Sequence, residues 1–246
     1  MERFFGQRIL RNAVEVTLVL KKDACAQPYN GQIADYLDPL PPWLKCVADD
    51  KKYLRKVLGK CRGALPMDYV ASVSRRVQLR ILECSIYRAT STIVLYAAKD
   101  NEVLTDLLLV DAFSSQRRVL LPRVIPETRE LVIVRVSNGA ELVPGSFGLL
   151  EPMGSEIVPV ADLGPALFCV PGVAFSRTGQ RLGRGGGYFD RILAAVGPQT
   201  ITAGLAYSFQ LLDRLPESPN DRRLNLIFTE SAMHAGQAFD RSTLAG

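Results

Sequence analysis

VPGVAFSRTGQRLGRGGGYFDRIL, residues 170–193, joins an apolar strand pattern to a helical pattern through a glycine-rich loop. Glycines stand at positions 179, 183, 185, 186 and 187, and the helical pattern starts at Tyr188. Because glycine has no Cβ, the backbone N–H groups of such a loop can turn toward one point. Together with the start of a helix, these groups form a cradle for an anion. The segment therefore predicts a strand–loop–helix unit of an α/β protein with a phosphate site in its loop.

Charged side chains in the same segment favour this interpretation over an ordinary flexible turn. Arg181 and Arg184 lie in the loop, where guanidinium groups can neutralise a phosphate and hold it through two hydrogen bonds. Asp190 follows just inside the helix, where a carboxylate can hold Mg²⁺ beside the phosphate. The loop is not a Walker A motif, because it lacks G-K-[ST], and its glycine spacing does not fit G-x-G-x-x-G. These residues alone indicate a phosphate-binding α/β enzyme.

The chain on both sides of this segment alternates strand patterns with helical patterns. Apolar, β-branched strand patterns cover residues 92–98, 117–124, 131–136, 166–170, 200–206 and 224–230. Helical patterns cover residues 49–62, the segment after Pro66 with its stripe of Val70, Val73, Val77 and Ile81, and residues 103–113 and 188–197. Continuously apolar strands that alternate with helices indicate an α/β fold with a mostly parallel sheet covered on both faces. Ligands of such sheets usually bind at the carboxyl ends of the strands.

Three regions are expected along the chain. Residues 1–49 form an N-terminal appendage of unknown role, because they contain the turn-forming clusters PYNG (28–31) and DPLPPW (38–43). A catalytic domain is expected over residues 50–232, and a C-terminal tail over residues 233–246.

Composition narrows the possible functions. The chain has 246 residues with 30 basic and 25 acidic side chains, so its net charge is 30 − 25 = +5. These charges are spread along the chain, whereas a nucleic-acid-binding protein more often has a basic run with aromatic residues. A single histidine, His234, argues against a Ser-His-Asp triad and against a multi-histidine metal site. Carboxylates suffice for Mg²⁺, which therefore stays possible.

Compartment and assembly are expected from the cysteines and from hydropathy. Five cysteines without a C-x-x-C pair argue for a reducing compartment and against a disulfide framework. No apolar run approaches the ~20 residues of a membrane span. The first residues carry Arg3, Arg8 and Arg11 but also Glu2 and Glu15, which makes a poor targeting sequence. We expect a cytoplasmic monomer without nucleic-acid or membrane partners, with the mitochondrion as the alternative location.

The glycine-rich segment resembles the signature of the 5-formyltetrahydrofolate cyclo-ligases, also called methenyltetrahydrofolate synthetases. That signature reads P-G-x-x-F-x-x-x-G-x-R-L-G-x-G-x-G-Y-[YF]-D, and residues 171–190 match each fixed position. The resemblance covers roughly residues 50–232 and implies a three-layer α/β/α sandwich. It also implies ATP as co-substrate, Mg²⁺ as cofactor and 5-formyltetrahydrofolate as substrate.

The resemblance assigns roles to individual residues. The ATP side of the site would comprise Lys51, Arg55, Arg181, Leu182, Gly183, Arg184, Gly185, Gly186, Gly187, Tyr188 and Phe189. The folate side would comprise Tyr96, Ala97, Glu102, Phe147, Arg184 and Tyr188, with Glu102 accepting hydrogen bonds from the pterin. Arg184 and Tyr188 would act in catalysis, and Asp190 and Asp221 would hold the metal.

Each of these roles has a plainer alternative, and the segment departs from the family pattern in three places. Lys51 and Arg55 could face solvent, Glu102 could sit at a helix start, Phe147 could pack in the core and Asp221 could belong to a turn. The departures are Phe189 in place of tyrosine, Ser176 in place of aspartate and Asn220 in place of the histidine that many members carry.

The implied reaction phosphorylates the formyl oxygen on N5, after which N10 attacks the activated carbon and phosphate leaves. Positioning and charge stabilisation suffice for this chemistry, which needs no histidine. Two rivals stay open: an ATP-dependent small-molecule kinase or ligase on a similar sheet, and a non-catalytic folate-binding protein.

Overall fold

A computed structural model describes residues 50–125, 127–128, 130–144, 150–237 and 239. An eight-stranded sheet forms its centre, with the strand order β13-β12-β10-β7-β1-β2-β3-β6. Neighbours from β12 to β2 run parallel, whereas β13, β3 and β6 pair antiparallel with their neighbours. The strands of this sheet are β1 (Thr92–Val94), β2 (Arg118–Ile125), β3 (Glu130–Val136), β6 (Ile157–Val158), β7 (Ala166–Val170), β10 (Thr200–Leu205), β12 (Leu226–Phe228) and β13 (Met233–Ala235).

Two smaller sheets, five α-helices and three short 3-10 helices accompany the large sheet in the described part of the chain. The three-stranded sheet holds β8 (Ala174–Ser176), β9 (Arg181–Leu182) and β11 (Leu211–Leu212), and β4 (Leu142–Pro144) pairs with β5 (Leu150–Pro152). The helices are α4 (Lys51–Gly63), α5 (Met67–Glu83), α6 (Ser85–Ala89), α7 (Asp106–Ser114) and α8 (Tyr188–Ala194). No helix among the residues placed here is both long and apolar enough to cross a bilayer.

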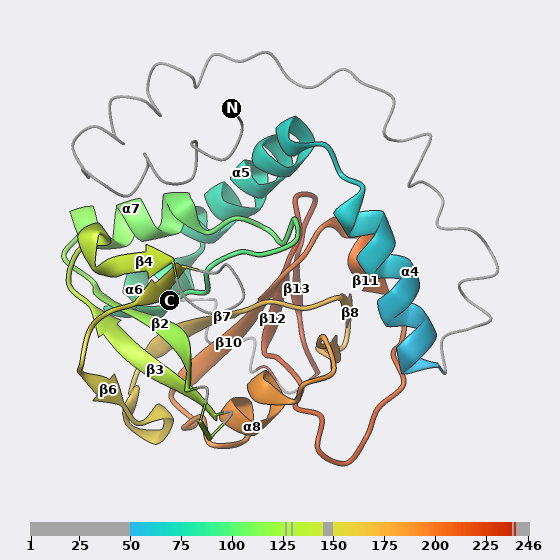
Figure 1. The fold of residues 1–246 in the computed structure, drawn as a ribbon. Coiled ribbons are helices and arrows are strands. Elements are labelled where there is room, and N and C mark those ends of the chain that lie inside the picture. Colours follow the sequence, from blue (N-terminus) through green and yellow to red (C-terminus); the bar gives the residue numbers. More distant parts are fainter. Residues whose placement is uncertain (1–49, 126, 129, 145–149, 238, 240–246) are drawn as a thin grey trace.

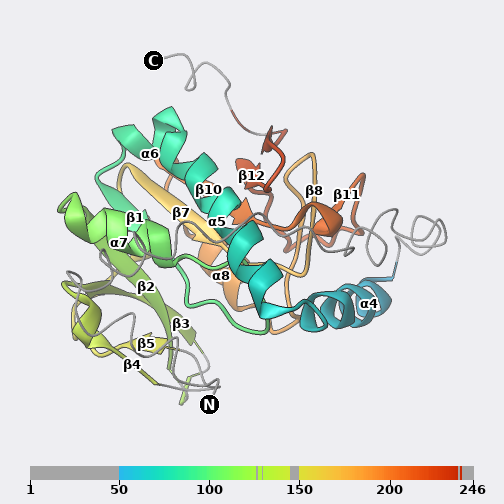
Figure 2. The ribbon, with the colours of Figure 1, turned by 90° about the horizontal axis from the view of Figure 1, so that it is seen from above.

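The large sheet is covered on both faces, so the predicted three-layer α/β/α sandwich with a mostly parallel sheet is confirmed. Figure 1 shows α5 and α7 on one side of the sheet and α8 on the other, and Figure 2 shows α5 and α7 lying across the strands. Ile93, Val119 and Leu167 face the core under α4–α7, whereas their neighbours Val94, Leu120 and Phe168 face the core under α8. This alternation buries β1, β7 and β12 along their whole length, which explains why these strands are apolar runs.

Local sequence features account for the first two helices. In α4, the Asp50 side chain accepts hydrogen bonds from the N–H groups of Lys52 and Tyr53, so the helix carries its own N-cap. In α5, the expected stripe of Val70, Val73, Val77 and Ile81 is fully buried against the sheet. These two helices therefore form as the sequence predicts.

Several element boundaries differ from the predictions. The strand expected over 92–98 ends at Val94, and the following residues turn away from the sheet. The helix expected over 103–113 begins only at Asp106, and the one expected over 188–197 ends at Ala194. Met233–Ala235 adds β13 to the sheet, so the sheet continues past the expected domain end at residue 232.

Gly179 occupies the turn between β8 and β9, and we expect Gly179→Ala to destabilise the protein. Its φ is +91°, and an added Cβ would meet the carbonyl oxygen of Leu224 at 2.3 Å. Backbone strain of this kind costs roughly 1–3 kcal/mol, and the clash adds to it. Denaturant titration measures the loss in the free energy of unfolding. Gly59→Ala in α4 is the matched control, because it meets no atom within 4 Å and should stabilise the helix by roughly 0.5–1 kcal/mol. Equal stability of the two variants would contradict the account of this turn.

Candidate active site

The carboxyl ends of β1, β2 and β7 open into a pocket of about 300 Å³. Parallel strands direct the segments that follow them to this edge, which is where ligands of such sheets bind. The pocket is lined by Tyr96, Ala97, Lys99, Glu102, Pro122, Val124, Leu131, Glu151, Pro171, Gly172, Arg181, Gly183, Arg184, Gly185, Gly186, Gly187, Tyr188, Phe189 and Asp190. The structure therefore brings the glycine-rich segment and the 96–102 segment together around one cavity.

The glycine-rich loop connects β9 to α8 along one wall of the pocket. Gly185 and Gly187 have φ values of +108° and +68°, which residues with a Cβ rarely adopt. Gly187 is also the N-cap of α8, so the loop enters the helix through a left-handed residue. A Cβ at Gly186 would lie 2.9 Å from the Tyr188 ring. The glycines thus allow a backbone path that other residues would block.

Arg181 braces the loop from within the protein. Its side chain is 3% exposed, and it donates from Nη2 to Oδ1 of Asp190 at 2.6 Å and from Nη1 to the carbonyl oxygen of Pro171 at 3.2 Å. The guanidinium also lies over the Phe189 ring, 5.7 Å from its centroid. Its Nε is buried without a hydrogen-bond partner among the residues described. Arg181 therefore fixes the start of α8 against the end of β7.

Arg184 reaches across the pocket to the 99–102 turn. It donates to Oε1 of Glu102 from Nη2 at 2.8 Å and from Nε at 3.2 Å, and Nη2 also donates to the carbonyl oxygen of Lys99 at 3.1 Å. It forms a further ion pair with Asp100. The hydrogen bond from Arg184 lowers the pKa of the Asp100 carboxyl below its usual range. Arg184 is thus the side chain that joins the nucleotide and folate sides assigned from the sequence.

The side of the pocket that was expected to hold folate combines a carboxylate with apolar surface. Glu102 is 6% exposed, and its Oε2 accepts a hydrogen bond from the N–H of Lys99 at 3.1 Å. Tyr96 is buried beside it and donates to the carbonyl oxygen of Val103 at 2.8 Å. Burial raises the pKa of the Tyr96 hydroxyl, and the charge of Glu102 raises it further. Tyr96 therefore stays neutral and serves as a fixed wall of the pocket.

Apolar lining residues from β2 and β3 complete this side, and the sequence motifs did not identify them. Pro122, Val124 and Leu131 contribute apolar surface, and Glu151 adds an acidic group from β5. A sequence signal for them would have required knowing that the carboxyl end of β2 borders the pocket. Phe147, expected here, lies outside the described residues.

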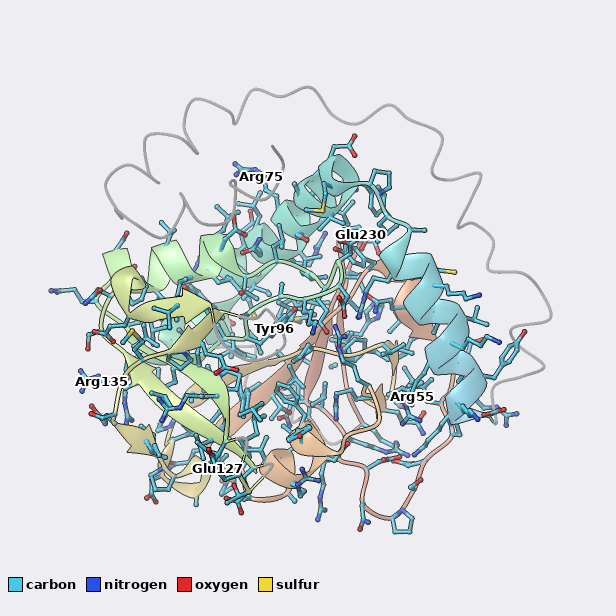
Figure 3. All side chains as sticks on the ribbon, viewed as in Figure 1. Arg55, Arg75, Tyr96, Glu127, Arg135 and Glu230 are labelled. Carbon is cyan, nitrogen blue, oxygen red and sulfur yellow. The ribbon has the colours of Figure 1, made fainter. Side chains whose placement is uncertain are left out.

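Arg55 of α4 contacts the glycine-rich segment, whereas Lys51 contacts the 218–221 turn, and neither residue lines the pocket. Arg55 donates from Nε to the carbonyl oxygen of Gly183 at 2.8 Å, and Figure 3 labels it where α4 approaches this segment. Lys51 donates from Nζ to Oδ2 of Asp221 at 2.5 Å and to Oγ of Ser218 at 2.7 Å. The structure thus pairs a residue expected to bind nucleotide with one expected to bind metal. Lys51 and Arg55 both have partners within the protein, so neither is a free solvent-facing side chain.

The two aspartates expected to hold Mg²⁺ belong to different ion pairs. Asp190 pairs with Arg181 and lines the pocket, whereas Asp221 pairs with Lys51 outside the lining. Within the described ranges, no three histidine, cysteine or acidic side chains gather where they could hold a metal. Mg²⁺ often binds through one or two carboxylates together with substrate phosphates. The pocket carboxylate of Asp190, beside the glycine-rich loop, fits such a shared site.

A second cavity of about 320 Å³ lies at the amino end of β2 and is lined in part by Arg117, Arg118 and Arg135. These guanidinium groups already have partners. Arg117 donates to the carbonyl oxygens of Tyr87 and Thr90. Arg118 and Arg135 face Glu156 at 3.9 and 3.3 Å. The arginines that line this cavity are therefore engaged in contacts within the protein.

Comparison with known proteins gives one consistent family. The profile of the 5-formyltetrahydrofolate cyclo-ligase family matches residues 47–230. A mitochondrial 5-formyltetrahydrofolate cyclo-ligase of Arabidopsis thaliana is 26% identical over 214 residues, which cover 77% of each chain. The 5-formyltetrahydrofolate cyclo-ligase of Haemophilus influenzae is 29% identical over 170 residues, which cover 68% of this chain and 90% of the relative.

Solved structures agree with the sequence comparison. The NMR structure of Aquifex aeolicus 5,10-methenyltetrahydrofolate synthetase superposes with a TM-score of 0.68 and 31% identity, covering 78% of this chain and 94% of that one. A 5,10-methenyltetrahydrofolate synthetase from Mycoplasma pneumoniae gives a TM-score of 0.59 and 27% identity, covering 74% and 99% of the two chains.

Proposed function

This chain belongs to the 5-formyltetrahydrofolate cyclo-ligase family, and we propose that its pocket converts 5-formyltetrahydrofolate to 5,10-methenyltetrahydrofolate with ATP, releasing ADP and phosphate. One observation carries the proposal: a single cavity joins a glycine-rich loop with cationic side chains to a buried carboxylate with apolar walls. The first half suits the phosphates of a nucleotide, and the second half suits the flat, N–H-bearing ring of a pterin.

The nucleotide side is formed by the loop and the residues that support it. The backbone of residues 182–187 and the side chains of Arg184 and Tyr188 face the transferring phosphoryl group in this proposal. Arg181 and Arg55 hold the loop in shape through the carbonyl oxygens of Pro171 and Gly183. Lys51 supports the start of α4 beside the 218–221 turn. Fixed donors of this kind stabilise developing charge without reorganising during the reaction.

The folate side is formed by Glu102, Tyr96 and Ala97, with Phe147 and the apolar lining of β2 and β3 around the ring. Glu102 accepts hydrogen bonds from the pterin N–H groups, because an ionised carboxylate is an acceptor at both oxygens. Its burial excludes competing water, which makes such bonds selective. Folate and nucleotide then meet at Arg184, which already contacts Glu102.

Two chemical steps follow from this arrangement. The formyl oxygen on N5 attacks the γ-phosphorus of ATP, the bond to the β-phosphate oxygen breaks, and ADP leaves. The N10 nitrogen then attacks the activated formyl carbon, the C–O bond to the phosphate breaks, and the N10 proton leaves with the phosphate, so that the methenyl bridge remains. Arg184 lies where it can offset charge on the phosphoryl group in the first step. The loop and Glu102 hold the two reactants in line.

Mg²⁺ is the proposed cofactor, held by Asp190 at the pocket and by the nucleotide phosphates, with Asp221 as a second candidate ligand. When bound, it supplies positive charge to the phosphate oxygens. Asp190 is oriented for this role by Arg181, which holds its Oδ1.

The dependence of ATP cleavage on folate tests the proposal. ADP formation should require 5-formyltetrahydrofolate, because the formyl oxygen is the phosphoryl acceptor. Cleavage at the same rate without folate, or with an unrelated hydroxyl acceptor, would favour the rival kinase or ligase. Folate binding with no ADP formed under any condition would favour the rival binding protein.

We also propose that the enzyme acts as a cytoplasmic monomer, with the mitochondrion as the alternative. Its five cysteines without a C-x-x-C pair favour a reducing compartment. The relative from Arabidopsis thaliana is described as mitochondrial, which keeps the alternative in view. Size-exclusion chromatography with light scattering tests the monomer, and imaging of the tagged full chain tests the compartment.

Removing residues 1–48 is expected to leave fold and activity intact, because the proposed catalytic domain begins at about residue 50. Helix α4 carries its own N-cap, Asp50, and would keep it in the shortened chain. The melting temperature and turnover of the shortened and full chains provide the comparison. A further cut through Lys51 and Arg55 should abolish ATP use, since Arg55 holds the glycine-rich segment and Lys51 holds the 218–221 turn. An insoluble or inactive 49–246 chain would show that the appendage belongs to the catalytic domain.

A further inference from the structure

Arg62, near the C-terminal end of α4, connects two walls of the pocket without lining it. The residue is 3% exposed. It donates from Nε to the carbonyl oxygen of Asp100 and from Nη1 to that of Gly172, both at 2.9 Å. The same Nη1 lies 3.8 Å from Oε1 of Glu102. Because Gly172 and Glu102 both line the pocket, one buried guanidinium fixes the folate-side carboxylate relative to the segment after β7.

The turn that presents Glu102 has a backbone shape that needs support. Asp100 and Asn101 have φ values of +50° and +57°, a region that residues with a side chain seldom occupy and that aspartate and asparagine tolerate best. The N–H of Glu102 donates to the carbonyl oxygen of Lys99 at 3.1 Å and closes the turn. Asn101 donates from Nδ2 to the carbonyl oxygen of Arg62 at 3.1 Å. The turn and the end of α4 therefore hold each other through both residues.

Glu102 faces two cations with different freedom to move. Arg184 is 44% exposed, belongs to the glycine-rich loop, and is the side chain proposed to meet the phosphoryl group. Arg62 is enclosed and fixed by two carbonyl oxygens. Burial lowers the pKa of the Arg62 guanidinium, and the charge of Glu102 opposes that effect. If Arg184 left Glu102 to contact a bound nucleotide, Arg62 would still face the buried carboxylate, which would otherwise lose its cation.

We propose that Arg62 is a positioning residue for folate, which holds Glu102 and its turn in place for the pterin while Arg184 serves the nucleotide. This inference rests on the proposed function, because it takes Glu102 as the pterin contact. Arg62 touches neither substrate and acts through Glu102. Its removal should therefore weaken the binding of folate and leave the binding of the nucleotide unchanged.

Steady-state kinetics of Arg62→Gln, Arg62→Lys and the control Lys60→Met test the proposal. Glutamine can still donate to a carbonyl oxygen but carries no charge, and lysine keeps the charge but cannot span both carbonyl oxygens. We expect the KM for 5-formyltetrahydrofolate to rise about tenfold in Arg62→Gln and about threefold in Arg62→Lys, with the KM for ATP unchanged. Lys60 is an exposed basic residue of the same helix, and its variant should behave as wild type.

A double-mutant cycle with Glu102→Gln separates this inference from the proposed function. If Arg62 acts through Glu102, adding Arg62→Gln to Glu102→Gln should change the folate KM less than about twofold. Additive losses, or equal losses of folate and ATP affinity, would overturn the role of Arg62. So would an unchanged folate KM in Arg62→Gln while Glu102→Gln raises it. If Glu102→Gln itself leaves the folate KM unchanged, Glu102 is not the pterin contact, and both the proposed site and the role of Arg62 are wrong. If Arg62→Gln does not fold, the same double-mutant cycle is measured with Arg62→Lys.

Discussion

Arg184→Ala should give a folded protein whose turnover is reduced roughly 30- to 1,000-fold. Loss of one preorganised charged donor at a transferring group typically raises the barrier by ~2–4 kcal/mol. Arg184 lines the pocket on the glycine-rich loop and contacts Glu102 on the opposite side. Its side chain is nearly half exposed, so its loss should affect the free energy of unfolding little. The defect should therefore appear in the reaction rather than in stability.

Initial rates at saturating ATP and folate measure this effect, and thermal melting checks the fold. Arg76→Ala is the matched control, because Arg76 is an exposed arginine of α5. Turnover within twofold of wild type in Arg184→Ala would remove this side chain from the chemistry. A large fall in melting temperature would assign its role to structure instead.

Glu102→Gln should raise the KM for 5-formyltetrahydrofolate roughly 5- to 150-fold, the range that corresponds to the ~1–3 kcal/mol of an unsatisfied buried polar group. Glutamine has nearly the same shape as glutamate, but its amide nitrogen would face the pterin donors or Arg184 at one of the two positions. Alanine is a poorer test, because it would also remove the side-chain oxygen that Arg184 and Arg62 face. The KM for ATP should stay within twofold of wild type.

Separate titrations of folate and a non-hydrolysable ATP analogue distinguish the two sides of the pocket. Glu156→Gln provides the matched carboxylate-to-amide control, because Glu156 is exposed and pairs with Arg135 outside the pocket. A selective loss of nucleotide affinity in Glu102→Gln, with folate affinity retained, would reverse the assignment of the two sides.

The strands of the large sheet were predictable where the sheet buries them on both faces. Residues 166–170 and 200–206 are apolar runs because β7 and β10 lie in the middle of the sheet. The short strands β8, β9 and β11 were not predicted, because two or three residues carry no periodicity. Their pairing depends on tertiary contacts, such as the one between the carbonyl oxygen of Leu224 and the turn at Gly179.

Parts of the site were predictable for a different reason. The glycine-rich loop is contiguous, so one stretch of sequence contains all of its residues and can be recognised as a motif. The structure places this loop around the pocket with Tyr96, Ala97 and Glu102. Arg62 gave no signal, because in sequence it is one of several basic residues on α4. Its burial depends on carbonyl oxygens of Asp100 and Gly172, 38 and 110 residues further along the chain. Such a contact exists only after the chain has folded.

The absorbance of 5,10-methenyltetrahydrofolate, followed after the full chain is mixed with Mg²⁺, ATP and 5-formyltetrahydrofolate, tests the central claim most directly. The proposed function predicts an increase that requires both ATP and protein and that matches the ADP released one for one. Leaving out any one reactant should abolish it. ATP cleavage without methenyl product, or folate binding without either product, would contradict the assignment of this pocket as a cyclo-ligase site.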